Sequence, residues 1–428
     1  MSISGKKTMI AAAGNAGLAQ YLITYTSTGQ GITTRLLSDG TTIASASSTQ
    51  NPYVFVTGHE LEDGSEIFTT QATSYTMYHG SIAESADYIV VGGTSSGGVN
   101  IYTVVTDKSG NLVKQQIYTF SLTYNSYGGM YAIEDDTSSN TLVYAAYNDS
   151  VCTGYAAYNI TGNSISNIAN YQYSAYGAGP QQYRGRNTRL SSGRFIKVQI
   201  AGYSASVGEI NGTSLSGSTG IGQGTGSGAY PYYYGVSVDD GDSDNIYLSG
   251  FLQTSPVRGR VVKMNSGRGI QWQREIYDTT SGKNIRIAVA DVTSTHVVGF
   301  GSYDNEGRVF FWDKNGTFDN SKTIRITHAS HSVSFTSAQV LPDGKRALVG
   351  LRLYTSATVQ DAVIAVFSLD NPPNGTYAGL TFGPENQSLT EAAGGSYSTA
   401  PGTVGKAYSY SSQGTSSTTG PSGTKTSI

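Results

Sequence analysis

The chain has 428 residues, of which only 13% are charged, and its formal net charge at pH 7 is −3. A chain of this length can form one large repeat-built domain or two ordinary domains. The scarcity of charged residues excludes the broad basic surface that nucleic-acid binding requires, so we expect no nucleic-acid partner. The single cysteine, Cys152, excludes an internal disulfide framework and a zinc site built from several cysteines.

Residues 1–30 are predicted to form an N-terminal arm that ends in a strand around Leu22. This strand is a candidate to complete the last repeat and so to close a ring of repeats. The apolar stretch Met9–Ala13 is too short for a secretory signal, and no window of the sequence has the apolar length of a membrane helix. We therefore expect synthesis in a cytoplasm and no membrane insertion.

Residues 31–370 repeat a pattern of four short apolar-alternating runs separated by Gly, Asn, Asp and Ser. This period-two alternation is typical of antiparallel strands joined by hairpins. Four strands in roughly 40–50 residues is the period of a β-propeller blade. The sequence thus predicts an all-β propeller of four-stranded blades with extended N- and C-terminal arms. Seven blades fit best, although six or eight also fit because the fourth repeat and both ends are weak.

The predicted blades can be followed along the chain by their first strands. These begin near Ile32, Tyr78, Gly129, Tyr183, Tyr232, Ile285 and Val333. The seventh blade has three clear strands, and the segment Tyr377–Phe382 is a candidate for its fourth strand. Segments that could form a helix of ten or more residues are absent from the sequence pattern, which argues against an α/β enzyme.

The fifth repeat shows the four-strand sequence pattern most clearly. Gly235–Phe251 reads GVSVDDGDSDNIYLSGF, and Gly259–Ile276 reads GRVVKMNSGRGIQWQREI. Together they resemble the β-propeller repeat of structural proteins from marine and cyanobacterial tailed phages, in which a GVAVD…NIYVTG segment precedes a strand ending in IQWQR. The resemblance covers about a tenth of the chain.

This resemblance implies a non-enzymatic structural component of a virion, associated with the tail as a fibre, nozzle or adaptor protein. Its partners would be other virion proteins and copies of itself, and it would be exposed on the released particle. The alternatives are a receptor- or glycan-binding propeller at the host-contacting end and a decoration protein on the capsid surface.

Residues 371–428 form a region rich in Gly, Ser and Thr with few large apolar side chains. A segment of this composition cannot bury enough apolar surface to order itself. We expect an extended C-terminal arm that packs on another surface. A neighbouring subunit is the preferred surface, and the chain's own propeller is the alternative.

Six tyrosines are candidates for contact with a glycan or another protein, because tyrosine combines a rigid apolar face with a polar tip. They are Tyr124, Tyr127, Tyr230, Tyr232, Tyr233 and Tyr234. They lie in segments that lead into the first strands of the third and fifth blades, and such segments gather at one end of a propeller. The alternative is that these rings pack between blades.

Three acidic residues at alternate positions, Asp240, Asp242 and Asp244, resemble the start of a calcium-binding loop. The later ligands of such a loop are missing, so a solvated turn is the alternative. His328 and His331 form an H-x-x-H pair without an evident third metal ligand. Neither a nucleophile elbow nor a phosphate-binding loop is present, and we predict no catalytic residues and no cofactor.

Overall fold

The computed structural model describes most of the chain in separate ranges. The described residues are 6–9, 20–28, 32–48, 53–73, 78–94, 100–119, 130–136, 141–147, 152–161, 164–174, 190–192, 195–201, 204–211, 214–222, 230–239, 241–356, 359–393, 408–409 and 424–426. Strands dominate these ranges, and their one helical element is the 3₁₀ turn η1 (Asn320–Lys322). Within the same ranges, no helix has the length and apolar character needed to cross a bilayer.

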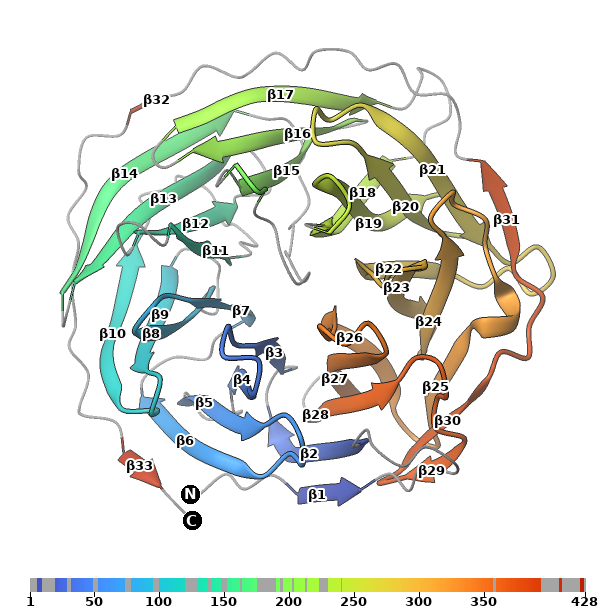
Figure 1. The fold of residues 1–428 in the computed structure, drawn as a ribbon, viewed down its shortest axis with the longest axis horizontal. Coiled ribbons are helices and arrows are strands. Elements are labelled where there is room, and N and C mark those ends of the chain that lie inside the picture. The colour runs from blue at the N-terminus through green and yellow to red at the C-terminus, as the bar shows by residue number, and fades with distance from the viewer. Residues whose placement is uncertain are drawn as a thin grey trace.

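Seven antiparallel sheets stand around a central axis as the blades of a propeller (Figure 1). Blade one contains β3 (Thr33–Leu36), β4 (Thr42–Ser48), β5 (Tyr53–Glu60) and β6 (Glu66–Thr73). Blade two contains β7 (Tyr78–Glu84), β8 (Tyr88–Thr94), β9 (Asn100–Asp107) and β10 (Leu112–Thr119). Blade three contains β11 (Met130–Asp136), β12 (Thr141–Tyr147), β13 (Cys152–Thr161) and β14 (Ser164–Ser174). In each blade, consecutive strands are neighbours in the sheet.

The fourth, fifth and sixth blades continue the ring. Blade four shows β15 (Phe195–Ala201), β16 (Ser204–Asn211) and β17 (Ser214–Gly222); the segment predicted as its first strand lies largely outside the described residues. Blade five contains β18 (Tyr230–Asp239), β19 (Asn245–Gln253), β20 (Arg258–Met264) and β21 (Ile270–Tyr277). Blade six contains β22 (Ile285–Val292), β23 (His296–Tyr303), β24 (Glu306–Asp313) and β25 (Ile324–His328). The predicted all-β propeller is confirmed.

Blade seven is built from both ends of the chain. Its inner strands are β26 (Ser332–Val340), β27 (Arg346–Ser356) and β28 (Val359–Ser368), and its fourth strand is β2 (Tyr21–Thr28), which pairs antiparallel with β28. The N-terminal strand β1 (Lys6–Met9) then pairs with β2 on the outside. The strand around Leu22 therefore joins the first and last repeats, and blade seven does not use Tyr377–Phe382 as its fourth strand.

The described parts of the C-terminal arm lie on the outer rim of the disc (Figure 1). They are β29 (Gly375–Tyr377), β30 (Leu380–Pro384), β31 (Thr390–Ala393), β32 (Tyr408–Ser409) and β33 (Thr424–Thr426). β30 pairs with β25 of blade six, β31 with β21 of blade five, β32 with β14 of blade three and β33 with β6 of blade one. The described arm strands thus pair with blades six, five, three and one, in the reverse of the chain order of the blades.

This placement corrects the preference for a neighbouring subunit, because the described arm strands all pair with their own chain. The outer strand of each blade presents unpaired backbone N–H and C=O groups, and an extended segment of almost any composition can pair with them. Two side chains add apolar contacts: Leu380 and Phe382 are buried in the core, and the Phe382 ring lies 5.6 Å from that of Phe367. The segment Tyr377–Phe382 is therefore an extension of blade six.

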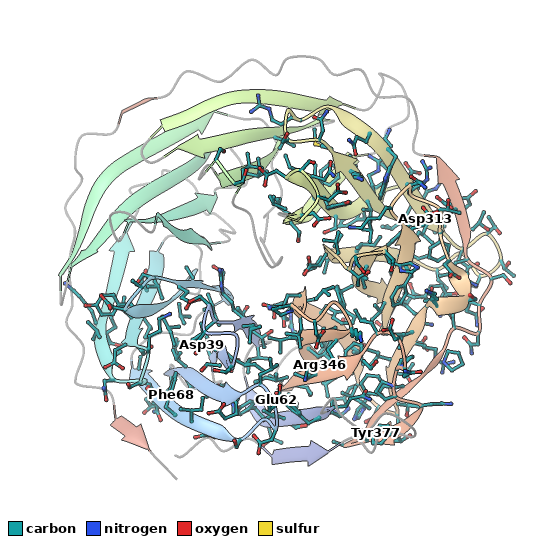
Figure 2. All side chains as sticks on the ribbon, viewed as in Figure 1. Asp39, Glu62, Phe68, Asp313, Arg346 and Tyr377 are labelled. Carbon is teal, nitrogen blue, oxygen red and sulfur yellow. The ribbon has the colours of Figure 1, made fainter. Side chains whose placement is uncertain are left out.

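The hydrophobic core lies between neighbouring blades. The largest cluster joins strands of blades six and seven, and other clusters join blade seven to one, one to two, four to five and five to six. Phe68 of blade one illustrates the fit (Figure 2). Its ring is buried against Gly58 and Gly110, where an added Cβ would come within 2.3 Å of the ring. Each blade is consequently stabilised by its neighbours.

Two fully buried arginines occupy equivalent places in blades five and six, each after a glycine and before a valine: Arg260 on β20 and Arg308 on β24. In blade five, Arg260 lies opposite Glu275 on the outer strand β21 and pairs with its carboxylate. Arg258 binds the same carboxylate at 3.3 Å. Blade five therefore supplies its own counter-charge.

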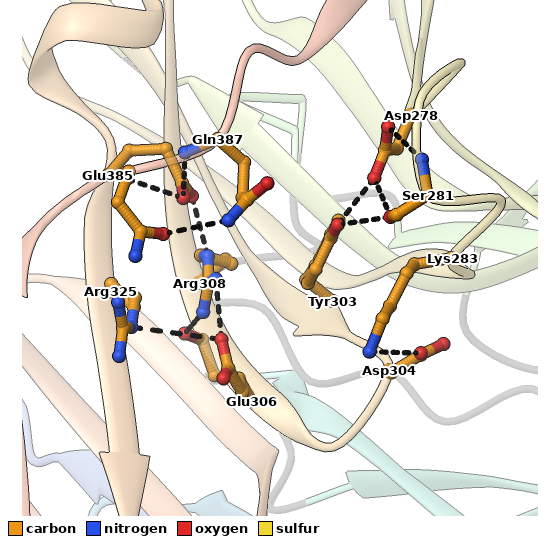
Figure 3. A network of polar contacts seen from close by, with 12 residues as sticks. Asp278, Ser281, Lys283, Tyr303, Asp304, Glu306, Arg308, Arg325, Glu385 and Gln387 are labelled. Atoms are coloured by element: carbon orange, nitrogen blue, oxygen red, sulfur yellow. Dashed lines mark hydrogen bonds and ion pairs between the residues drawn. The ribbon is translucent and has the colours of Figure 1, made fainter.

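In blade six the residue opposite Arg308 is another arginine, Arg325. The counter-charge for Arg308 comes instead from Glu385 of the arm, at 2.6 Å from Nε, and from Glu306, at 2.6 Å from Nη2 (Figure 3). The side chain of Glu385 is only 2% exposed. Arg325 lies 3.7 Å from Glu306 and completes the network. The arm thus supplies part of the counter-charge for the buried arginine of blade six.

Candidate functional site

The structure separates the tyrosines that the sequence grouped as a contact surface. Tyr233 is only 1% exposed and packs in the core cluster of blades four and five, so it cannot contact a glycan. Tyr232 is half-buried and stacks on Phe251, with ring centroids 4.9 Å apart. Tyr233 therefore follows the alternative prediction of packing between blades, which corrects its assignment to a contact surface, whereas the contact role of Tyr232 stays a prediction.

The remaining tyrosines are not placed as side chains. Tyr230 and Tyr234 belong to the described backbone of β18, but their side chains lie outside the described part of the structure. Tyr124 and Tyr127 fall in the range 120–129, which is also outside it. Their contact role stays a prediction.

The acidic turn of blade five uses its carboxylates for contacts within the protein. Asp244 accepts hydrogen bonds from the backbone N–H of Ser191 at 3.0 Å and from its hydroxyl at 2.5 Å. Asp242 lies 3.8 Å from Nζ of Lys263. Asp240 is outside the described residues, and no group of three or more potential metal ligands occurs within them. Nothing here supports the calcium prediction for Asp242 and Asp244.

His328 and His331 lie against each other at the end of β25, with their Nδ1 atoms 2.7 Å apart. Burial and the neighbouring His331 hold the pKa of His328 below its usual value. The two rings are therefore hydrogen-bonded to one another, and the described residues provide no third ligand for a metal at this position.

A groove of about 510 Å³ lies at the junction of blades five and six. The motif IQWQR (Ile270–Arg274) forms one wall on β21, and Lys263 on β20 adds to it. Lys314 and Asn315, in the turn after β24, form the opposite side. The part of the sequence that carries the phage-repeat resemblance is therefore also the wall of this groove.

Local sequence fixes the turn that faces Trp272. Oδ1 of Asp313, which is labelled in Figure 2, accepts hydrogen bonds from the N–H groups of Thr317 and Asn315 at 2.8 and 2.9 Å. These bonds keep the pKa of Asp313 below its usual value. Gly316 has φ +89° and lies so close to the indole that an added Cβ would stand 2.9 Å from it. Only glycine suits both demands.

The turn is held to Trp272 and Arg274 by direct hydrogen bonds. Nε1 of Trp272 donates to the carbonyl of Lys314 at 3.1 Å. Nε of Arg274 donates to the carbonyl of Gly316 at 2.7 Å and also lies 2.7 Å from Glu391 of the arm. Glu391 in turn accepts from the N–H of Phe318 at 3.0 Å. The groove, the two blades and the arm are therefore fixed together.

Two ammonium groups flank a buried tyrosine beneath the groove. Nζ of Lys263 lies 5.8 Å, and Nζ of Lys314 6.0 Å, from the ring centre of Tyr247. Lys314 also pairs with Asp239 at 2.8 Å. Burial, followed by the nearby Asp239 and Asp242 carboxylates, raises the pKa of Tyr247. The phenol therefore stays protonated, and it supplies a neutral, polarisable surface for the two cations.

The residues that line the groove are of types that bind ligands. Its lining offers one indole, one aliphatic side chain, three amides and three cations, with carboxylates behind the cations. Sequence reasoning identified the IQWQR motif only as a strand. The groove was missed because Trp272 and Lys314 are 42 residues apart and meet only when blades five and six pack.

Comparisons with known proteins identify the fold and no family. No family model matches the sequence, and no curated protein matches it. Among solved structures, the hydrazine synthase of Kuenenia stuttgartiensis has a TM-score of 0.51 and 11% identity, over 81% of this chain and 99% of that chain. The Dos1 propeller has a TM-score of 0.46 and 12% identity, over 85% and 94% of the two chains.

The WD40 domain of Toxoplasma gondii coronin has a TM-score of 0.45 and 9% identity, over 85% and 86% of the two chains. Some similar structures bear enzyme names, including a 6-phosphogluconolactonase described as putative, from Bacteroides uniformis (TM-score 0.48, 9% identity, 74% and 95% covered). At such identities the likeness concerns the fold alone, and propellers host many unrelated functions.

Proposed function

We propose that this protein is a non-enzymatic structural propeller of a tailed-phage virion, associated with the tail. Two observations support the proposal. The first is the resemblance of Gly235–Phe251 and Gly259–Ile276 to the repeat of phage structural proteins. The second, which carries the physical argument, is the belt of arm strands around the disc (Figure 1).

The arm strands suit a component of a particle, because they cover strand edges that could otherwise pair with other chains. An open outer strand is a template for another chain, and the risk grows when many copies are crowded together. Described arm strands extend blades one, three, five and six, and β1 extends blade seven. The disc is then left to make specific contacts through its loops and faces.

The ion pairs between the arm and the blades favour a structural role for the arm. Glu385 and Glu391 bind Arg308 and Arg274, so the arm is attached by ion pairs as well as by strand pairing. A rigid disc of this kind can display loop-covered faces to other virion proteins, to further copies of itself or to a host receptor. In this role the protein would be made in the host cytoplasm and exposed on the released particle.

The test is the protein content of purified particles. Mass spectrometry of density-purified virions that carry the coding sequence should detect the chain at a fixed ratio to the tail proteins. Gold-labelled antibodies against the recombinant protein should mark the tail in electron micrographs. Absence of the chain from washed particles would refute the virion role, and label confined to the capsid would refute the tail position.

A further inference from the structure

The groove between blades five and six has the composition of a site for hydroxyl-rich molecules. Trp272 is half-buried at its wall, and two exposed residues with amide side chains, Gln271 and Asn315, line it from the two blades. An amide can donate and accept hydrogen bonds at once, as a sugar hydroxyl does. An aromatic wall with a few polar groups is the usual form of a small-molecule site, and the groove volume lies within the ordinary range of about 300–1,000 Å³.

The charges of the groove are balanced. Lys263 is paired with Asp242, Lys314 with Asp239, and Arg274 with Glu391. An anionic ligand would have to displace a carboxylate from its cation, and the nearby carboxylates would repel it. A neutral ligand meets a donor and an acceptor at each pair without breaking it, so charge balance selects against polyanions.

We propose that this groove binds a neutral saccharide. The apolar face of a sugar ring would lie on Trp272, and its hydroxyl groups would bond to Gln271, Asn315 and the ammonium group of Lys314. The wall is pre-formed, because Trp272 is fixed by its bond to the Lys314 carbonyl and by the close approach of Gly316. Such pre-organisation reduces the entropy lost on binding. This binding site is independent of the virion role proposed above.

The test uses the full chain and an array of neutral oligosaccharides made of hexoses, 6-deoxyhexoses and N-acetylhexosamines. The same array carries counterparts that contain uronate, sialate or sulfate. We expect binding to at least one neutral oligosaccharide and weaker binding to its acidic counterpart. Titration of the best neutral oligosaccharide should change the tryptophan fluorescence through Trp272, because the other tryptophan, Trp312, is fully buried.

Variants locate the site. The double variant Gln271→Ala with Asn315→Ala should weaken binding about tenfold, because two hydrogen bonds to the ligand are lost. Trp272→Phe should keep an aromatic wall and retain most of the affinity, and its fluorescence should no longer respond. Gln253→Ala, an exposed glutamine on β19 outside the groove, is the matched control and should bind as the unchanged chain does.

Three results would overturn the proposal. They are no binding to any neutral oligosaccharide on the array, binding to acidic saccharides alone, and unchanged affinity in the double variant. Both glutamines and Asn315 are exposed, so these substitutions should leave the thermal midpoint within about 1 °C of the unchanged chain. A thermal scan of each variant separates loss of binding from loss of fold.

Discussion

Blades five and six neutralise the charge of a buried arginine in different ways. Both bury an arginine on the third strand, Arg260 in one and Arg308 in the other. Blade five places Glu275 opposite its arginine, whereas blade six places Arg325 there and borrows Glu385 from the C-terminal arm. Blade five thus neutralises its buried arginine with its own carboxylate, whereas blade six needs the arm for part of the counter-charge of its buried arginine.

The largest expected effect belongs to blade five. Glu275→Gln should destabilise the protein by about 3–5 kcal/mol, because both Arg258 and Arg260 lose their shared carboxylate and Arg260 is fully buried. Differential scanning calorimetry can measure the change. Hydrogen exchange of the arm residues 380–384 should stay as in the unchanged chain. Faster exchange there would contradict the independence of blade five from that part of the arm.

Glu385→Gln should cost about 3 kcal/mol, at the lower end of the same range because Glu306 still binds Arg308. This substitution should also loosen the arm. We expect faster hydrogen exchange in residues 380–384 and proteolytic cleavage of the arm before the disc unfolds. A stability loss with an equally protected arm would mean that strand pairing alone holds it.

The junction between blades seven and one buries neutral polar groups in place of ion pairs. Tyr25 on β2 bonds to Nε2 of His59 on β5 at 2.6 Å, between blades seven and one. Burial lowers the pKa of His59 from 6.5 to about 4. The unfolded chain therefore takes up a proton first, and stability present above pH 6.5 is lost as the pH falls towards 4.

The size of this loss is about 3 kcal/mol at most, from 1.36 kcal/mol for each unit of pKa difference. Urea denaturation at pH 7 and at pH 4.5 should show it for the unchanged chain. In His59→Gln the difference between the two pH values should shrink by most of that amount. An unchanged difference would show that other groups dominate the acid sensitivity.

The smallest effect is expected at the partly exposed ion pair between the arm and blade five. Glu391→Gln should cost less than about 1 kcal/mol, because both Arg274 and Glu391 are about one quarter exposed and solvent screens them. The same charge is removed as in Glu385→Gln, so this variant is its matched control. A loss as large as that of Glu385→Gln would remove the distinction between a buried and an exposed attachment.

The short apolar-alternating runs were enough to predict the blades, although inner strands such as β19 and β20 are buried along almost their whole length. The ring-closing position of β2 follows from a leftover strand and an incomplete last blade. The place of the arm could not be predicted, because backbone pairing at an open edge leaves no side-chain signature. Sequence reasoning preferred a neighbouring subunit because an arm so rich in Gly, Ser and Thr has too few large apolar side chains to order itself.

The groove and the Arg308 network were missed for a related reason. Glu385 is 77 residues from Arg308, and Lys314 is 42 residues from Trp272. One signal was available: aligning Arg260 with Arg308 places Arg325 where blade five has Glu275. That substitution leaves blade six without a counter-charge on its outer strand and implies a carboxylate from elsewhere.

The most direct test moves the charge layout of blade five into blade six. Glu306→Arg and Arg325→Glu together reproduce Arg258 and Glu275, and they can be combined with Glu385→Gln. If blade six depends on the arm for counter-charge, this triple variant should recover most of the thermal midpoint lost by Glu385→Gln alone, while its arm stays loosened. A midpoint equal to or below that of Glu385→Gln would contradict the account.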